Sequence, residues 1–294
     1  MIRIIPRLDI KGPNIIKGLC YDGYRVLGKP ELFSEIYYNE GADELFFQDA
    51  VASLYERNNL LDIVSLTAGK VMIPITVCGG IRNIEDITEA LNAGADKVGI
   101  NSAAIKKPDF LEKAARKFGS QCIVLSIEAK KIDNGKYEVW SDYGREPSGF
   151  GIKKWAKDAE NFGIGEIYLS SVDNDGTGLG FDIDLINEIT SYSKVPVIAS
   201  GGAGNYDDFL EAINKTNLDA ISAASVFHYN YANELKNKIT NNKSSILRMG
   251  KHIDTGNIEF INEGYGGFDN IQVNLCSIKN LKVFLNENNI NVRI

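Results

Sequence analysis

The sequence predicts a (β/α)8 TIM barrel built from two repeated half-barrels. Eight short apolar runs alternate with segments of helical periodicity over 294 residues, and this alternation favours a parallel sheet that eight units can close. Several of the runs end at an acid or at Gly-Gly, and the second half of the chain repeats the spacing of the first. An open doubly wound sheet is the alternative, weakened because no G-x-G-x-x-G follows the first strand.

Each element has a local signal. Apolar runs predict strands at 3–9, 44–49, 73–78, 96–101, 122–128, 166–171, 195–200 and 218–224. Helices are expected at 31–39 (started by Pro30), 58–69, 84–92, 108–118, 150–162, 182–191 and 206–214. Gly and Tyr residues predict a loop over 18–29. Asn134-Gly135 predicts a hairpin turn within a polar excursion over 130–143.

Bulk composition narrows the class of protein. The chain is 44% hydrophobic and 24% charged, which suits a single globular domain over residues 1–294 with a large core. The net charge is −7 without a basic block, so we expect no nucleic-acid partner. No apolar run is long enough to cross a bilayer, and the N-terminus lacks the features of a signal peptide. A cytoplasmic location without a membrane partner is therefore expected.

Cysteine and histidine content restricts the chemistry. The four cysteines are scattered without C-x-x-C spacing, which favours reduced thiols over disulfides or zinc ligands. The only histidines are His228 and His252, so histidine triads and multi-histidine metal sites are not expected. We expect no metal and no cofactor, and acid–base chemistry by carboxylates, lysine or cysteine.

A glycine-rich strand end occurs in each half of the chain. The run PVIASGGAG (196–204) predicts a buried strand opening into a loop of small residues, and PITVCGGI (74–81) nearly repeats it. Such a loop beneath a helix N-terminus can bind phosphate through backbone N–H groups. Two such loops at one barrel mouth predict a substrate with a phosphate at each end. The alternative is that duplication preserved the turns and not the sites.

Ten short stretches carry a resemblance to a known family. They are RIIP (3–6), LD (8–9), KG (17–18), GADEL (41–45), AGADKV (93–98), FGSQC (118–122), GEI (165–167), DNDGT (173–177), IASGGAG (198–204) and AAS (223–225). From Arg3 to about Asn230, and again near the C-terminus, the chain resembles the cyclase subunits (HisF) of imidazole glycerol phosphate synthases. The related isomerase of histidine synthesis shares the half-barrel repeat but lacks the SQC and ASGGAG motifs.

The resemblance implies a reaction in a (β/α)8 barrel. Ammonia attacks phosphoribulosyl-formimino aminoimidazole carboxamide ribotide, which carries two phosphates, and the products are imidazole glycerol phosphate and aminoimidazole carboxamide ribotide. Asp9, ending the first strand, would be a general acid/base, with Glu128 at the end of the fifth strand as its partner. Lys17 would close over the substrate, and Asp49 would help to orient it.

The same resemblance implies binding regions and a partner. One phosphate would bind at Gly80, Asn101 and Ser102. The other would bind at Asp175, Gly176, Gly202, Ala224 and Ser225. A charged gate at the opposite end of the barrel would admit ammonia, and it would consist of Arg3, Glu44, Lys97 and Glu166. The ammonia would come from a glutaminase subunit (HisH type) bound as a heterodimer, near Asp96 and Gln121.

Departures from the family pattern keep other functions open. Glu128 stands where the family has Asp, Cys78 replaces the first Gly of a Gly-Gly-Gly motif, and Arg7 replaces a Cys. Residues 238–276 are expected to be an insertion before the C-terminal helix. One alternative is a HisF-like subunit of an amidotransferase system that forms amidino sugars of surface polysaccharides. Another is a non-catalytic scaffold for the glutaminase, which the retention of Asp9 and Lys17 disfavours.

Overall fold

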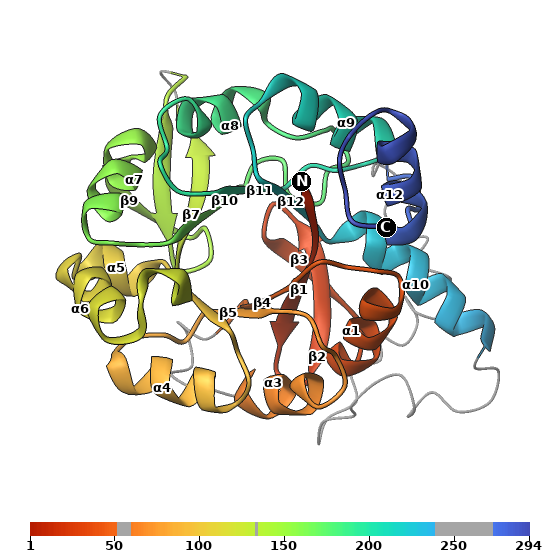
Figure 1. Cartoon of the computed structure of the whole chain (residues 1–294), viewed down its shortest axis with the longest axis horizontal. Helices are drawn as coiled ribbons and strands as arrows, with labels where there is room; N and C mark the ends of the chain where they lie inside the picture. Colours follow the sequence, from red (N-terminus) through yellow and green to blue (C-terminus); the bar gives the residue numbers. More distant parts are fainter. Residues whose placement is uncertain (52–59, 133–134, 239–272) are drawn as a thin grey trace.

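Eight parallel strands form a closed barrel in the computed structural model, which describes residues 1–51, 60–132, 135–238 and 273–294 (Figure 1). In order around the barrel the strands are β1 (Arg3–Lys11), β4 (Leu45–Asp49), β5 (Ile75–Cys78), β6 (Lys97–Ile100), β7 (Ile123–Lys131), β10 (Glu166–Ser171), β11 (Val197–Ser200) and β12 (Ala220–Ala223). The pairing of β7 with β10 and of β12 with β1 closes the circle. The predicted barrel is confirmed, and the open-sheet alternative is wrong.

Helices surround the barrel on its outside (Figure 1). They are α1 (Pro30–Asn39), α3 (Leu60–Ala68), α4 (Ile84–Asn92), α5 (Ser102–Lys106), α6 (Asp109–Phe118), the short 3-10 helix η1 (Ser120–Cys122), α7 (Ile152–Asn161), α8 (Ile183–Thr190), α9 (Tyr206–Lys215), α10 (Ser225–Lys238) and α12 (Ile278–Glu287). The predicted helices agree with these bounds within about two residues, although residues 58 and 59 of the helix predicted at 58–69 lie outside the described residues. The sequence pattern does not predict α5, η1 or α10.

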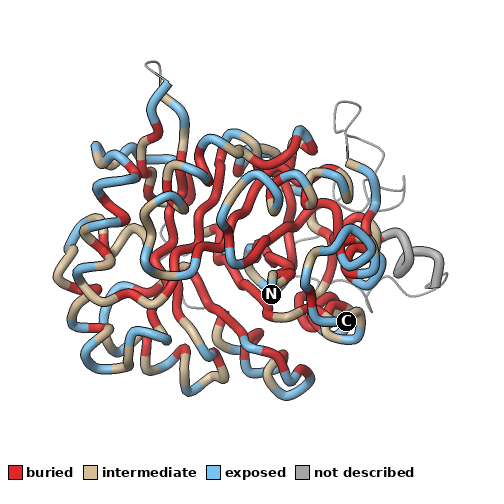
Figure 2. The backbone as a smooth tube through the Cα atoms, turned by 45° about the horizontal axis from the view of Figure 1, so that its top comes forward, coloured by how far each residue is buried: buried red, intermediate tan, exposed pale blue. Residues whose placement is uncertain are grey.

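Alternation along the strands separates two cores. Outward-facing residues of β1, such as Ile4 and Leu8, pack with the helices in the main apolar core. Inward-facing Ile5 belongs instead to a small cluster inside the barrel that includes Phe46 and Tyr168. Burial accordingly follows the strands and the inner faces of the helices (Figure 2). Among the described residues every helix falls short of the length and apolar character that a membrane span requires.

The half-barrel repeat extends to the turns. Gly79 and Gly80 after β5 have φ values of 96° and 78°, and Gly201 and Gly202 after β11 have 100° and 111°. A capping box then starts the next helix in each half, Asn83 with Asp86 at α4 and Asn205 with Asp208 at α9. The two phosphate-type loops are therefore local copies of each other in backbone and in helix start.

The loop expected over 18–29 is wrong. Strands β2 (Asn14–Leu19) and β3 (Asp22–Gly28) form an antiparallel hairpin there, with positive φ at Cys20 and Tyr21 in the turn. Gly18 lies within β2. Position 18 requires a glycine because a Cβ there would come 1.9 Å from the Asp22 carbonyl oxygen. This glycine permits close approach of two strands and does not break one.

The polar excursion is also more regular than predicted. Strands β8 (Tyr137–Ser141) and β9 (Glu146–Gly151) extend β7 as an antiparallel ribbon. Gly135 has the positive φ of 76° expected for the hairpin turn, whereas residues 133–134 lie outside the described residues. Most of the insertion expected at 238–276 also lies outside them, since the description stops at residue 238 and resumes at 273.

Candidate active site at the barrel mouth

The barrel interior consists of layers stacked along its axis. Every second residue of β1 points inward, which places Arg3, Ile5, Arg7 and Asp9 in successive layers toward the carboxyl ends of the strands. Charged residues occupy the first layer, and an apolar layer with the stacked rings of Phe46 and Tyr168 follows, ring centroids 3.6 Å apart. The Arg7 guanidinium comes next, and the carboxylates lie at the mouth.

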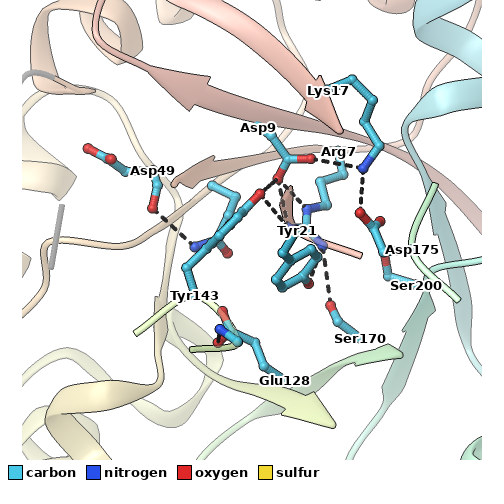
Figure 3. A network of polar contacts seen from close by, with 12 residues as sticks. Arg7, Asp9, Lys17, Tyr21, Asp49, Glu128, Tyr143, Ser170, Asp175 and Ser200 are labelled. Carbon is cyan, nitrogen blue, oxygen red and sulfur yellow. Dashed lines mark hydrogen bonds and ion pairs between the residues drawn. The ribbon is translucent and has the colours of Figure 1, made fainter. Parts of the chain in front are cut away.

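Asp9 is the centre of a buried polar cluster at the mouth (Figure 3). Its side chain is 1% exposed. Oδ1 accepts hydrogen bonds from Arg7 Nε at 2.8 Å and from the Tyr143 hydroxyl at 2.9 Å, and Arg7 Nη2 lies 2.7 Å away. Oδ2 faces Lys17 Nζ at 3.5 Å, and the same ammonium is 2.5 Å from Asp175 Oδ2. The predicted residues Asp9, Lys17 and Asp175 are thus brought together.

The two acids of the mouth have opposite electrostatic surroundings. Burial alone would raise the pKa of Asp9, but the charges of Arg7 and Lys17 and the hydrogen bond from Tyr143 hold its pKa below the ordinary value. Glu128 is also buried, and burial raises its pKa to about 7 although the Gly144 N–H donates to Oε2 at 2.8 Å. Near neutral pH Asp9 is therefore a carboxylate, whereas Glu128 exchanges its proton readily.

A cavity of about 360 Å³ lies beside Glu128. Its lining includes Glu128, Tyr143 and the three residues expected to bind one phosphate, Gly80, Asn101 and Ser102. Arg82, Lys106 and Lys107 also line it, so three cationic residues border the same cavity as the expected phosphate-binding residues. The Asn101 Oδ1 atom is buried and has no hydrogen-bond partner within the described part of the chain. This cavity has both the room and the charge to receive an anion.

The second predicted phosphate region is much tighter. Asp175, Gly176, Gly202, Ala224 and Ser225 surround a space of only about 10 Å³, roughly the room that one water needs. The β2–β3 hairpin lies against this region, since the Cys20 N–H donates to the Asp175 carbonyl at 2.8 Å. Ser225 begins α10, and its buried Oγ has no hydrogen-bond partner among the described residues. A space of about 10 Å³ is too small for a phosphate, so residues around it would have to move before one could bind here.

Asp49 lies apart from the other mouth residues (Figure 3). Its Oδ1 accepts a hydrogen bond from the Val51 N–H at 2.9 Å, two residues further along the chain. A Cβ on Gly79 would come within 3.0 Å of the Asp49 Cβ. Asp49 thus packs against the first glycine loop, and the structure does not bring it into the cluster around Asp9.

The predicted gate residues form a closed ring of ion pairs at the opposite end of the barrel. Arg3 binds Glu44 at 2.5 Å and Glu166 at 2.6 Å. Lys97 binds the remaining oxygens of the same two carboxylates, each at 2.9 Å. Each cation therefore bridges both acids, and both acids are more than 90% buried. Asp96 accepts a hydrogen bond from the Ile75 N–H, which ties it to a neighbouring strand.

Three residues of the mouth were missing from the predicted site: Arg7, Tyr21 and Tyr143. The Arg7 position was visible in the sequence, because alternation places a residue two before Asp9 on the same inward face of β1. Tyr21 and Tyr143 come from two hairpins, and no local pattern indicates that their rings stack at a centroid distance of 4.3 Å. Among the described residues, no group of His, Cys, Asp and Glu is arranged to hold a metal ion.

The closed barrel, its charged ring and its paired mouth acids define an α/β-barrel protein with an enzyme-like site. Residues 3–233 match the profile of the family described as "Histidine biosynthesis protein". Over 208 residues the chain is 54% identical to the imidazole glycerol phosphate synthase subunit HisF of Legionella pneumophila, covering 71% of this chain and 98% of that protein. The chain belongs to this histidine biosynthesis family, as the resemblance predicted.

Proposed function

We propose that the chain is the cyclase subunit of an imidazole glycerol phosphate synthase. In this proposal it uses ammonia to convert phosphoribulosyl-formimino aminoimidazole carboxamide ribotide to imidazole glycerol phosphate and aminoimidazole carboxamide ribotide. The observation that carries the proposal is the pair of mouth acids with opposite surroundings, Asp9 held ionised and Glu128 with a pKa of about 7. The 54% identity to a HisF subunit supports this function over the amidino-sugar and scaffold alternatives.

Each acid has a separate task in the proposed reaction. Asp9, as a carboxylate, accepts a proton from the nitrogen that ammonia delivers, and Glu128 returns a proton to the departing ribotide. Glu128 lines the larger cavity, so it lies near the phosphate end bound by Gly80, Asn101 and Ser102. Lys17 leaves Asp175 when the substrate arrives and pairs with the substrate. Asp49 packs against Gly79 and so supports the first glycine loop.

The second phosphate is proposed to bind after the β2–β3 hairpin moves. Gly176, Gly202, Ala224 and Ser225 then present backbone N–H groups and the Ser225 hydroxyl. Ser225 starts a helix of 14 residues, whose dipole favours an anion at this end. Departure of the hairpin also frees Lys17, so binding of this phosphate and release of Lys17 from Asp175 are coupled.

We further propose that a glutaminase subunit docks over the charged ring and supplies ammonia through it. The Legionella pneumophila relative is named as a subunit of its synthase, which supports a partner for this chain. Ammonia entering the barrel would have to open one of the four ion pairs and then displace the stacked Phe46 and Tyr168 rings. The four cysteines are free thiols, which fits a cytoplasmic enzyme.

Purified chain supplied with ammonium and the formimino ribotide tests the proposal. We expect imidazole glycerol phosphate to form, Asp9→Asn to abolish its formation, and Glu128→Asp to change the rate without abolishing it. Asp62→Asn, at an exposed position on α3, is the matched control and should retain full activity. Absence of turnover above background in the unmodified chain would refute the proposed function, and an active Asp9→Asn would remove Asp9 from the mechanism.

A further inference from the structure

Arg7 is a large cation in an unusual place, inside a barrel and 1% exposed. One nitrogen of its guanidinium, Nη1, has two partners. It donates to the Tyr21 hydroxyl at 2.7 Å and to Ser170 Oγ at 3.4 Å. The Tyr21 ring lies 4.7 Å from the Arg7 Cζ atom, within cation–π range. Because all these partners are themselves buried, the guanidinium is held in one orientation.

This orientation determines which oxygen of Asp9 is free to react. Oδ1 is surrounded by three donor atoms, Arg7 Nε, Arg7 Nη2 and the Tyr143 hydroxyl, all within 2.9 Å. Within the described part of the chain, the polar neighbour of Oδ2 is Lys17 Nζ, at 3.5 Å. A proton placed on Oδ1 would displace strong donors, whereas Oδ2 can accept one as soon as Lys17 moves.

We propose that Arg7 is the positioning residue of the site, which occupies Asp9 Oδ1 and thereby makes Oδ2 the oxygen that exchanges a proton with the substrate. This inference rests on the proposed cyclase function of the same site. Arg7 lies one inward-facing position before Asp9 on β1, and so one layer deeper in the barrel, whereas neither side chain lines the 360 Å³ cavity. It acts through Asp9 and does not touch the substrate.

Arginine suits this task because a guanidinium stays protonated under all ordinary conditions. Asp9 is completely enclosed, and without an opposite charge its burial would favour the neutral acid. The charged and titratable groups that act on Asp9 come from several elements: Arg7 on β1, Lys17 on β2, Tyr21 and Tyr24 near the turn of the hairpin, Tyr143 between β8 and β9, Tyr168 on β10 and His228 on α10. Of these, Arg7 has the largest effect that favours the carboxylate.

The test is the pH dependence of kcat/KM for ammonium-driven turnover in Arg7→Gln, Arg7→Lys and Tyr143→Phe. Loss of an opposite charge at this range shifts a carboxyl by about 1–3 pH units. We therefore expect the acidic limb of the Arg7→Gln pH profile to move upward by about 1–3 pH units, so that kcat falls at pH 5 relative to the unmodified chain and changes little at pH 8. KM should stay within about twofold. Arg7→Lys should move the acidic limb of the pH profile less far than Arg7→Gln does. Tyr143→Phe should also move this limb upward, by a smaller amount than Arg7→Gln.

The matched control is Arg116→Gln, since Arg116 is exposed on α6 and forms a surface ion pair with Glu112. Titration of the ¹³C-labelled Asp9 carboxyl by NMR gives a second readout that needs no turnover. An Asp9 titration and an acidic limb that stay at the unmodified values in Tyr143→Phe and in whichever Arg7 variant folds would overturn the proposal. If the unmodified chain does not turn over the ribotide, the cyclase function fails, while the Asp9 titration still decides whether Arg7 controls Asp9.

Discussion

Replacing Glu128 by Gln should make the protein more stable at pH 8, and the reason is the burial of this acid. Its pKa rises from an ordinary 4.5 to about 7 in the folded chain. A tenfold change in an equilibrium corresponds to about 1.4 kcal/mol, so ionising Glu128 in the folded state costs roughly 3 kcal/mol more than in the unfolded chain. A glutamine at this position avoids that cost, and its carbonyl can still accept the Gly144 N–H.

The sign of the pH dependence follows from the raised pKa. Between about pH 4.5 and pH 7 the folded state holds the Glu128 proton while the unfolded chain has already lost it, so stability falls as pH rises through this window. Below the window the acid is neutral in both states, and the substitution should change stability little. Above it the difference should reach its full value of roughly 3 kcal/mol.

Urea unfolding of the unmodified chain and of Glu128→Gln at pH 4.5 and pH 8 measures this difference. Subtracting the free energies of unfolding of the two proteins at each pH cancels the contributions of the other titrating groups. The exposed Glu112→Gln on α6 serves as the control and should show no comparable growth of the difference with pH. If the stability difference for Glu128→Gln is the same at both pH values, the raised pKa, and with it the assignment of Glu128 as the proton donor, is wrong.

Two further predictions concern the ring and the second glycine loop. Lys97→Met removes one cation from two buried carboxylates, so it should lower the free energy of unfolding by about 1–3 kcal/mol in urea. With a glutaminase partner it should also reduce glutamine-driven turnover more than ammonium-driven turnover, and an equal reduction of both would argue against a gate. Gly202→Ala places a Cβ 1.9 Å from the Gly180 carbonyl oxygen, whereas Gly135→Ala, also at a positive φ, has open space around its Cβ. We expect Gly202→Ala to be less stable than Gly135→Ala by about 1–3 kcal/mol and to raise KM for the ribotide; equal stability would refute the packing argument.

The barrel was predictable because its signals are local. Strand and helix periods alternate along the chain, and the repeated Gly-Gly turns fix where strands end, as at Gly79 and Gly201. The same local reasoning failed at the β2–β3 hairpin. Gly18 is an ordinary turn signal in sequence, and only the approach of Asp22 from the partner strand explains a glycine there. The close approach of the two strands is a tertiary contact, which the residues around Gly18 in the sequence do not reveal.

The candidate site shows the same division. The resemblance to the HisF family predicts Asp9, Lys17 and Asp175 as site residues, and the structure brings their side chains together through the contacts of Lys17. The resemblance also predicts Asp49, whose carboxylate accepts a hydrogen bond from its own loop. A motif indicates that a residue ends a barrel strand but does not give the direction of its side chain, which depends on the loop that follows.

The two glycine loops illustrate how duplicated backbone can serve unequal sites. Their φ values and capping boxes agree, yet one opens into about 360 Å³ and the other into about 10 Å³. The β2–β3 hairpin, which carries Lys17 and Tyr21, contacts Asp175 beside the second loop through the Cys20 N–H and the Lys17 ammonium. In the proposed function, movement of this hairpin would make room at the second phosphate region, release Lys17 and expose Asp9 Oδ2 in one step. Arg7 would keep Oδ1 occupied meanwhile, so that the first loop can bind one end of the substrate before the acid–base pair becomes accessible to the other.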